Sequence, residues 1–537
     1  MKKRLLTALL SGALILTALA GCGQVAENQS GANDASAGGE SGARDELIFV
    51  NYRDIRDLNP HLYAGEMYAQ SILYDTLVSN TEDGYVGCLA EDWTISDDGR
   101  IYTFNIRDGV TFSDGTPCDA NAILANFNAI LENRERHTWL EMMNLLVSVS
   151  APDSDTFVIE MSEPYYPMLT ELACIRPFAM ISPNCMIDGS TMNGVNGYIG
   201  TGPYVLTDFV TDEYAVFERN ENYWGEAPAI QKITVKVIPD NQTRIMALEN
   251  EEIDLIFGKN MLDADAISQY VDSDRFTVSL SDPTSTRHIV LNTTHDILGD
   301  VAVRKALQHA TNRQAISEGI FYGLEPAADT LYSPTVPYCD VDLEPYAYDT
   351  DEAARLLDEA GWVMGSDGVR AKNGQKLELD LLYNSDSVTE KTISEYLQSE
   401  YLKLGISLNI HGEEEQSYRD NMKAGNFDMV FNICWGMPYD PQSSLAAMRA
   451  PVYGDYAAQQ GLEDKAEIDQ AITDILTSTD ETERQELYDF VLTRLHEDAV
   501  YIPLTYETNK ALYTSELKGV HFGTDQYDVD FASMYFE

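Results

Sequence analysis

Strand-like and helix-like segments alternate along this chain, and this alternation limits the folds that it can adopt. Short apolar or alternating runs, typical of strands, recur between stretches with helical spacing, and no internal repeat is present. The expected strands are 46–52, 101–112 (a pair joined at an Asp-Gly turn), 230–238, 287–294 and 427–434. The expected helices are one capped by Asp119, then 301–310, 350–361 with Thr350 as its cap, and 482–495. Interleaved strands and helices predict an α/β protein, and 537 residues are too many for one core.

The N-terminus predicts export. Three basic residues precede an apolar run, 5–20, that is too short for a comfortable membrane span and ends in LAGC. This ending resembles the lipobox of bacterial lipoproteins, in which the Cys is acylated and becomes the first residue. We therefore expect 1–22 to be a lipoprotein signal peptide with Cys22 as the lipidated residue. Residues 23–44, rich in Gly, Ser, Ala and Asn, are expected to be a flexible tether.

The charge of the chain restricts its partners. It carries 88 acidic side chains against 35 Lys plus Arg, a formal charge of −53. Such a field repels nucleic acid and anionic membranes and keeps a protein soluble. We expect no nucleic-acid partner, a monomer, and membrane attachment through the lipid alone, on the extracytoplasmic side (cell surface or periplasm).

The residues that usually carry chemistry do not form an enzyme motif. The sequence has no GxSxG, HExxH or GxxxxGK[ST], and its histidines form no pair at ligand spacing on one helix. We expect no enzyme and no resident cofactor; a secreted hydrolase is the alternative from another class. Six cysteines follow Cys22 without a CxxC, and Cys174 with Cys185 is consistent with either a small disulfide loop or two buried thiols.

One short stretch runs against the acidic composition. In ENRERHTWLEMM, residues 132–143, Arg134, Arg136 and His137 stand together, and Trp139 follows. A guanidinium is permanently charged and can hold a carboxylate through two hydrogen bonds, while an indole can pack on an apolar ligand or a cation. On the residues alone, pairing with some of the many carboxylates is the competing interpretation.

Longer motifs carry a resemblance to a family. LNPHLY (58–63), LAEDWTISDDGRIYTFNIRDGVTFSDGTP (89–117), IGTGPYVLTDFV (199–210) and the segment 215–258 resemble extracytoplasmic solute-binding proteins of the dipeptide/oligopeptide/nickel class, solute-binding protein family 5. The resemblance covers essentially the whole mature chain. It implies a receptor that works with the permease and ATPase subunits of an ABC importer. It also implies the two-lobed, type II periplasmic-binding-protein-like fold, with a hinge and a ligand cleft between lobe I (45–284 plus 508–537) and lobe II (285–507).

Within the class, the resemblance is greatest to the nickel-binding receptor. It is carried by ENRERHTWLE, EPYYPMLTELACIRPF, STMNGVNGYIGTGPY, CWGMPYDPQSSLAAMRAP and DETERQELYDFVLTRLHEDAVYIPLTYE. This implies capture of nickel, or a related divalent metal, as a small chelate. The residues that the resemblance places in the cleft are Tyr63, Met67, Arg136, Trp139, Arg176, Trp435 and Tyr439. Arg136 and Arg176 are then expected to bind the carboxylates of the chelate in a solvated cleft.

The chain departs from the nickel receptor at one position. Where that receptor supplies a His to the metal, this sequence has Tyr453, and a neutral phenol is a poor nickel ligand. Either the chelator coordinates the metal wholly, or the natural ligand differs. His288 is the remaining candidate for a metal contact, whereas His61 and His137 are expected to be structural. The alternatives within transport are a metallophore receptor and a dipeptide or oligopeptide receptor, which would have an Asp early in the stretch where this chain has WGMPYDP.

Overall fold

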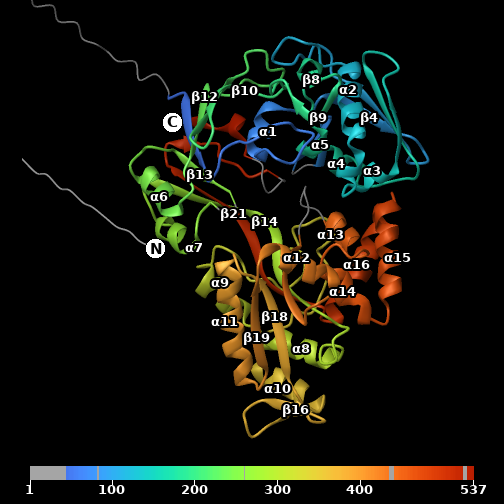
Figure 1. Cartoon of the computed structure of the whole chain (residues 1–537), viewed down its shortest axis with the longest axis vertical. Helices are drawn as coiled ribbons and strands as arrows, with labels where there is room; N and C mark the ends of the chain where they lie inside the picture. The colour runs from blue at the N-terminus through green and yellow to red at the C-terminus, as the bar shows by residue number, and fades with distance from the viewer. Residues whose placement is uncertain (1–43, 82–83, 259–260, 435–440, 524–528) are drawn as a thin grey trace, which may run out of the picture. The chain divides into compact units, whose positions relative to one another are not determined.

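The computed structural model describes residues 44–81, 84–258, 261–434, 441–523 and 529–537. Cys22, the signal peptide, the tether up to residue 43, Trp435 and Tyr439 lie outside the described residues. Strands and helices alternate along the chain, which confirms the predicted α/β class (Figure 1). Arg44, which we expected in the tether, instead forms an ion pair of 2.7 Å with Asp254.

Ten of the described strands form one continuous sheet. In spatial order they are β10 (Tyr204–Val210), β11 (Tyr214–Arg219), β12 (Lys232–Val237), β1 (Glu46–Asn51), β13 (Leu255–Phe257), β21 (Tyr501–Thr514), β14 (Phe276–Leu291), β20 (Met429–Cys434), β18 (Glu378–Asn384) and β19 (Ser407–Glu413). β1 runs parallel to β12 and β13, and β18 runs parallel to β19 and β20. The long antiparallel pair β14 and β21 joins these two parallel regions.

Smaller sheets accompany the large one. They are β4 (Ala90–Ile95), β5 (Ile101–Ile106), β7 (Thr156–Met161) and β6 (Leu146–Ser150) in this order; β2 (Val78–Thr81) with β3 (Gly84–Gly87); β8 (Met186–Ile187) with β9 (Ser190–Val195); β15 (Val363–Met364), β16 (Arg370–Lys372) and β17 (Gln375–Lys376); and β22 (Leu517–Lys518) with β23 (Tyr535–Phe536).

The helices occupy both halves of the chain. In the first half they are α1 (Met67–Leu73), α2 (Ala120–Glu132), η1 (Arg134–His137), α3 (Glu141–Leu145), α4 (Met168–Leu172), α5 (Ile175–Phe178), η2 (Pro183–Cys185), α6 (Asn241–Glu249), α7 (Ala264–Ile267) and η3 (Ser268–Tyr270). In the second half they are α8 (Val301–Ala310), α9 (Arg313–Ile320), α10 (Thr350–Glu359), α11 (Val388–Lys403), α12 (Glu415–Ala424), α13 (Pro441–Ala447), α14 (Gly454–Ala458), η4 (Gln459–Gly461), α15 (Lys465–Thr477), α16 (Glu481–Glu497) and η5 (Phe531–Ser533). No helix in the described part of the chain is long and apolar enough to cross a membrane.

Side-chain capping explains where several helices begin. The Asp119 carboxylate accepts hydrogen bonds from two backbone N–H groups of α2, as predicted. For α10 the predicted cap is wrong by one residue. Asp349, and not Thr350, accepts from the N–H groups of Asp351 and Glu352. Because one carboxylate oxygen serves two donors there, the helix starts at the position after Asp349.

The predicted strand pair at 101–112 is only half correct. β5 ends at Ile106, and Gly109 makes the turn with φ +77°. The residues after the turn do not pair back onto β5, because β4 and β7 already occupy its two edges. Phe112 instead donates its N–H to the carbonyl of Thr116, 2.8 Å away.

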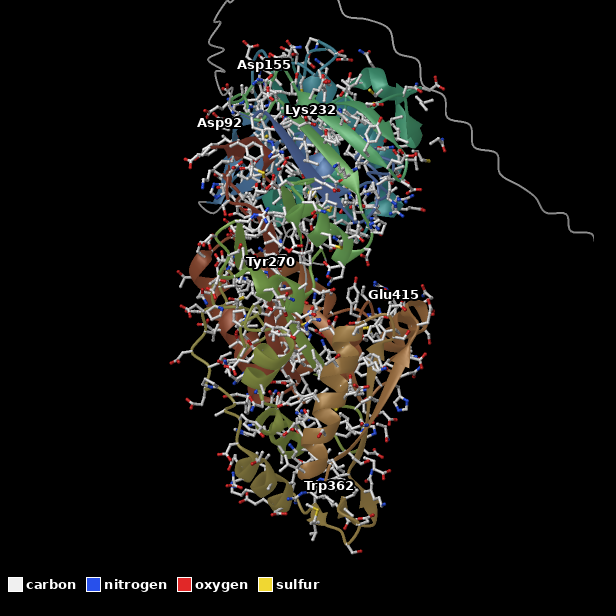
Figure 2. All side chains as sticks on the ribbon, turned by 90° about the vertical axis from the view of Figure 1, so that its left-hand side faces the viewer. Asp92, Asp155, Lys232, Tyr270, Trp362 and Glu415 are labelled. Atoms are coloured by element: carbon white, nitrogen blue, oxygen red, sulfur yellow. The ribbon has the colours of Figure 1, made fainter. Side chains whose placement is uncertain are left out.

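Apolar residues from distant parts of the sequence share one core beside β1. Phe49 of β1 packs edge-to-face on Phe531 near the C-terminus, with ring centroids 5.2 Å apart. Many of the acidic residues instead lie on the surface, as Asp92 and Asp155 do in Figure 2. The described cysteines are all buried thiols outside any disulfide, so Cys174 and Cys185 are not bonded to each other.

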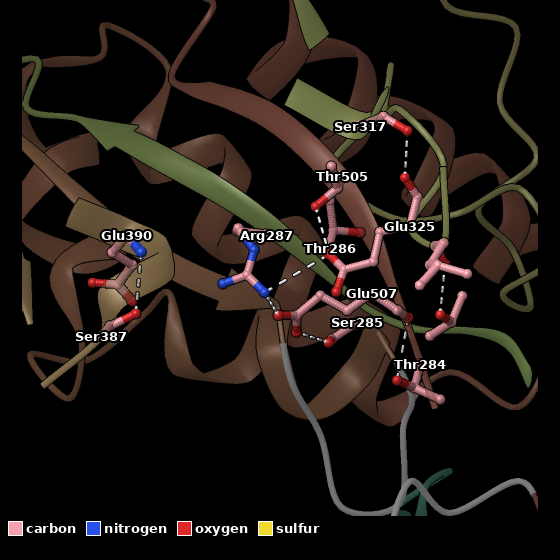
Figure 3. A network of polar contacts seen from close by, with 12 residues as sticks. Thr284, Ser285, Thr286, Arg287, Ser317, Glu325, Ser387, Glu390, Thr505 and Glu507 are labelled. Atoms are coloured by element: carbon pink, nitrogen blue, oxygen red, sulfur yellow. Dashed lines mark hydrogen bonds and ion pairs between the residues drawn. The ribbon is translucent and has the colours of Figure 1, made fainter. Parts of the chain in front are cut away.

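The strands β14 and β21 carry buried charges where their register shifts (Figure 3). Arg287 pairs with Glu507 and lies 3.8 Å from Glu325, and Lys510 lies 3.2 Å from Glu325. Each of these four side chains is at most 14% exposed. Burying charges is costly unless they are paired, so the two cations and two carboxylates hold one another in place.

Candidate ligand-binding site

The centre of the candidate site is the phenol of Tyr63. It lies against η1, the short helix that follows α2 and contains Arg134, Arg136 and His137. The indole Nε1–H of Trp139 donates to the Tyr63 hydroxyl at 2.8 Å, and Nδ1 of His137 lies 2.6 Å from the same oxygen. Both rings meet the phenol edge-to-face. Burial raises the pKa of Tyr63 to about 12, although the bond from Trp139 opposes this shift.

Arg136 supplies an uncompensated positive charge beside this phenol. Its guanidinium carbon lies 5.9 Å from the centroid of the Tyr63 ring, and the residue is exposed. Among the described residues, no carboxylate forms an ion pair with it. The neighbouring Arg134 differs, because its guanidinium donates to the carbonyl oxygens of Asn144 and Leu146. The alternative interpretation, that Arg136 serves a structural ion pair, therefore finds no support in the described part of the molecule.

Arg176 is placed differently from our expectation. The sequence led us to expect this guanidinium in a solvated cleft, but the residue is only 8% exposed. It donates to Oε1 of Gln70 at 2.6 Å and to the carbonyl oxygens of Tyr63 and Gly65 at 3.3 and 2.5 Å. The expectation of a solvated Arg176 is wrong, because these acceptors draw its guanidinium into the protein. Arg176 braces the segment that carries Tyr63.

Two glycines of the IGTGPY motif fix the helix next to this segment. A Cβ at Gly200 would lie 2.0 Å from the carbonyl oxygen of Leu73, the last residue of α1, so no other residue fits there. The N–H of Gly202 donates to the same oxygen at 3.0 Å. Helix α1 begins at Met67, which is half-buried and follows Tyr63 closely in the chain. The motif thus positions the helix that carries Met67 and Gln70.

The predicted site residues of the second half are less completely described. Tyr453 is the N-cap residue of α14, which packs against α12. Burial raises the pKa of Tyr453, and Arg419 opposes this shift. Trp435 and Tyr439 lie outside the described residues, directly after β20. The placement of these three residues in a cleft with Tyr63 stays a prediction.

The histidines considered as metal contacts are buried. His288 is 1% exposed, its Nδ1 lies 3.1 Å from the carbonyl oxygen of Thr286, and its ring meets Tyr501 edge-to-face. Burial lowers its pKa to about 4. Such a position argues against a direct contact between His288 and a ligand. Within the described ranges, no group of three or more His, Cys, Asp or Glu side chains is arranged to hold a metal ion.

His61 and His137, which we expected to be structural, are both buried and hydrogen-bonded. His61 is 1% exposed, and its Nδ1 lies 2.9 Å from Oγ1 of Thr191. Gln70, the acceptor for Arg176, was not among the predicted site residues. The one signal for it in the sequence is an amide among the apolar residues of MYAQSIL, because an amide that is buried needs a hydrogen-bond partner.

Comparison with known proteins decides the family. The family model described as "Bacterial extracellular solute-binding proteins, family 5 Middle" matches residues 84–455. The chain is also 42% identical over 494 residues to the nickel-binding periplasmic protein of Escherichia coli K12, covering 91% of this chain and 94% of the relative. The chain belongs to solute-binding protein family 5.

The similarity of this family 5 protein to its relatives extends to the structure. The crystal structure of NikA from Brucella suis in complex with Fe(III)-EDTA superposes with a TM-score of 0.88 at 43% identity, covering 92% of this chain and all of that one. A more distant relative, the periplasmic oligopeptide-binding protein OppA of Salmonella typhimurium, is 26% identical and covers 96% of this chain and 95% of its own length. The present chain therefore has the two-lobed α/β fold of family 5. The members of this family are solute-binding receptors.

Proposed function

We propose that this protein is the substrate-binding lipoprotein of an ABC importer that captures nickel, or a related divalent metal, as a small chelate complex. The observation that carries the proposal is the exposed guanidinium of Arg136 beside Tyr63 and Trp139, which forms no ion pair with any carboxylate that the structure describes. These are positions that the resemblance to nickel-binding receptors places in the cleft. The 42% identity to a relative named for nickel binding supports the same ligand class.

The charge of the site favours a chelate over a bare ion. A guanidinium repels a metal cation, whereas it binds a carboxylate through charge-assisted hydrogen bonds. Each such bond contributes about 1.5–3 kcal/mol. Tyr453 stands where the nickel receptor has an imidazole, so the chelator itself would complete the coordination of the metal. The structure determined with Fe(III)-EDTA gives a precedent in a relative for a metal held by a carboxylate-bearing chelator.

Capture would proceed by closure of two lobes about the paired strands β14 and β21. We place lobe I at 45–284 plus 508–537 and lobe II at 285–507. Support comes from β14, whose register against β21 shifts between Leu280 and Pro283 and again between Pro283 and Ser285. A register shift weakens the regular ladder locally, so bending is easiest there. The proposed boundary at 284/285 falls at this point.

A contact between the proposed lobes supports a closed form. Tyr166, from the segment after β7, lies against α16. The guanidinium carbon of Arg484 is 3.4 Å from the centroid of the Tyr166 ring, and the Tyr166 hydroxyl donates to Oε1 of Glu481 at 2.7 Å. Arg484 is fully buried. We name Tyr166, Tyr338, Glu481 and Arg484 the lobe contact, since Tyr338 also hydrogen-bonds Tyr166 and Glu481.

The partners follow from the family and the N-terminus. Family 5 receptors deliver their ligands to ABC permease and ATPase subunits, and we propose the same for this chain. Lipidation at Cys22 would keep the receptor at the outer face of the cytoplasmic membrane, near its permease. The acidic surface is consistent with a monomer that diffuses on its tether.

The proposal is tested by identifying the ligand and then removing Arg136. Native mass spectrometry of protein from its own host should show a retained complex containing a divalent metal; a retained peptide instead would favour the oligopeptide alternative. In calorimetry, Arg136→Ala should weaken binding of nickel–histidine by about 1.5–3 kcal/mol. Arg134→Ala is the matched control, because that arginine already bonds backbone carbonyls. Equal affinity of wild type and Arg136→Ala for nickel–histidine would contradict the proposed site.

A further inference from the structure

The hydroxyl of Tyr63 has an unusual set of neighbours. The indole nitrogen of Trp139 can only donate, so one lone pair of the Tyr63 oxygen is occupied by the Trp139 N–H at 2.8 Å. The second neighbour, Nδ1 of His137 at 2.6 Å, can donate or accept according to the tautomer of the imidazole. The tautomer of His137 therefore decides what Tyr63 can offer to a ligand.

The surroundings of His137 favour one tautomer. The residue is fully buried, and its Nε2 has no hydrogen-bond partner in the described part of the protein. Burial, with Arg136 nearby, lowers the pKa of His137 to about 4, so the ring is neutral at pH 7. A neutral imidazole carries its proton on one nitrogen only. Buried N–H groups without an acceptor are rarer in proteins than buried acceptors without a donor. The proton therefore belongs on Nδ1, and Nε2 is left with its lone pair.

This arrangement frees the hydroxyl proton of Tyr63. With N–H groups of Trp139 and His137 both donating to its oxygen, the phenol accepts nothing more and can only donate. Its pKa of about 12 keeps the proton in place at neutral pH. Tyr63 is half-buried, and the exposed Arg136 places its guanidinium carbon 5.9 Å from the centroid of the Tyr63 ring, so a positive charge lies beside the phenol. An anionic oxygen is the ligand group that satisfies both the O–H and the guanidinium.

We infer that His137 is a positioning residue which, with Trp139, fixes the Tyr63 hydroxyl as a hydrogen-bond donor to a carboxylate oxygen of the ligand. This inference rests on the proposed function and adds a selectivity to it. Chelators with an outward carboxylate bind well, whereas chelators that present only N–H groups there meet a site without an acceptor. Arg136 supplies the positive charge, and the Tyr63 hydroxyl donates a hydrogen bond only to ligands that place an oxygen acceptor there.

The tautomer can be measured without any ligand. In protein labelled with ¹⁵N-histidine, the nitrogen shifts of His137, assigned by comparison with His137→Asn, should show a protonated Nδ1 and an unprotonated Nε2. A protonated Nε2 would overturn the inference directly, whatever the protein binds. This measurement does not depend on nickel, so its failure is distinct from failure of the proposed function.

Binding measurements test the consequence. The probes are nickel–histidine and nickel–histamine, which shares the imidazole and amine but lacks the carboxylate. Tyr63→Phe should weaken nickel–histidine by about tenfold or more, as for a lost hydrogen bond to a charged group, and change nickel–histamine little. His137→Leu should weaken nickel–histidine similarly, but should add nothing in the Tyr63→Phe background.

Two controls separate positioning from folding. His137→Asn places an amide nitrogen as many bonds from the backbone as Nδ1, so it should restore most of the affinity that His137→Leu loses. A further loss on adding His137→Leu to Tyr63→Phe, equal to its loss in the wild type, would show that His137 acts only through the fold and would overturn the inference. If the wild type binds neither nickel complex, the proposed function fails, and the nitrogen shifts alone then decide the tautomer.

Discussion

Removing one hydroxyl from the lobe contact tests whether Tyr166 stabilises a closed form. Tyr166→Phe keeps the aromatic ring 3.4 Å beneath the Arg484 guanidinium and deletes only the O–H that donates to Glu481. The change therefore leaves the cation–π contact in place. It removes the hydrogen bonds that the Tyr166 hydroxyl makes across the proposed lobe boundary, one to Glu481 and one to Tyr338.

The structure sets the size of the effect. The bond from Tyr166 to Glu481 is a hydrogen bond of 2.7 Å to a charged group, for which about 1.5–3 kcal/mol is typical. Glu481 is exposed, so the lower end, about 1.5 kcal/mol, is appropriate because water can replace the lost partner. About 1.4 kcal/mol is a factor of ten in an equilibrium constant. The closed form should lose about tenfold in population relative to the open form, and the apparent Kd for ligand should rise by up to the same factor.

A neighbouring tyrosine provides the matched control. The hydroxyl of Tyr165 also donates to a carboxylate, Oε1 of Glu171 at 2.6 Å, but both residues belong to the same proposed lobe. Tyr165→Phe should lower the melting temperature and leave the affinity for nickel–histidine unchanged. Tyr166→Phe should instead weaken the affinity for nickel–histidine and change the melting temperature little. At sub-saturating ligand, small-angle X-ray scattering should show a larger radius of gyration for this variant than for the wild type. Equal effects of the two variants on affinity would refute a role of this contact in closure.

The remaining predictions concern lipidation at Cys22, the hydrogen bonds of Arg176, coordination of the metal, and the dependence of stability on pH. Cys22→Ser should release the protein from the membrane fraction, and persistence there would contradict the lipoprotein interpretation. Arg176→Ala should lower both the melting temperature and the ligand affinity, because its hydrogen bonds to Gln70 and to the carbonyl oxygens of Tyr63 and Gly65 are lost. A lower affinity at an unchanged melting temperature, both measured by calorimetry, would show instead that Arg176 acts on the ligand directly. Tyr453→His should strengthen, in calorimetry, only nickel complexes with an open coordination position, and tight binding of bare nickel by the wild type would refute the reasoning. His61 and His288 have pKa values of about 3 and about 4, below the ordinary 6.5, so only the unfolded state binds protons there as pH falls below 6.5. The free energy of unfolding, measured in urea, should therefore decrease from pH 6.5 towards 4 by about 1.4 kcal/mol per pH unit per histidine, and His288→Phe should reduce that slope; an unchanged slope would refute this account.

The sequence was sufficient for the fold class because the signals involved are local. Apolar spacing predicted α2 and α16, and Asp119 was correctly predicted as the cap of α2. The strand signals located β12 and β20 to within a few residues. β14 is longer than predicted, since it begins at Phe276 and includes Pro283. A proline normally argues against a central strand, but Pro283 lies where the register shifts and no regular ladder bond is required.

The sequence predicted which residues belong to the candidate site, but it did not predict the hydrogen bonds that these residues make. Arg136 and Trp139 are exposed, as a ligand-binding role requires. Arg176 has the same chemistry as Arg136, but its acceptors lie more than one hundred positions earlier in the chain, at 106, 111 and 113 residues' separation. No local sequence pattern distinguishes a guanidinium that hydrogen-bonds such distant oxygen atoms from one that is available to bind a ligand. The tautomer of His137 depends on the same kind of distant contact, with Tyr63.

The edge-to-face contact of Phe49 with Phe531 has a consequence for biogenesis. β1 is among the first described segments of the chain, and Phe531 and Met534 complete its core only from the far end. Strand β13 pairs with β1 on one edge and with β21 on the other, so its second edge stays unpaired until β21 has been synthesised. Pairing of segments so distant in sequence is slow to form. A nascent chain that still lacks the segment from Tyr501 to Glu537 therefore cannot complete this core, so this part of the fold forms only when synthesis is nearly finished.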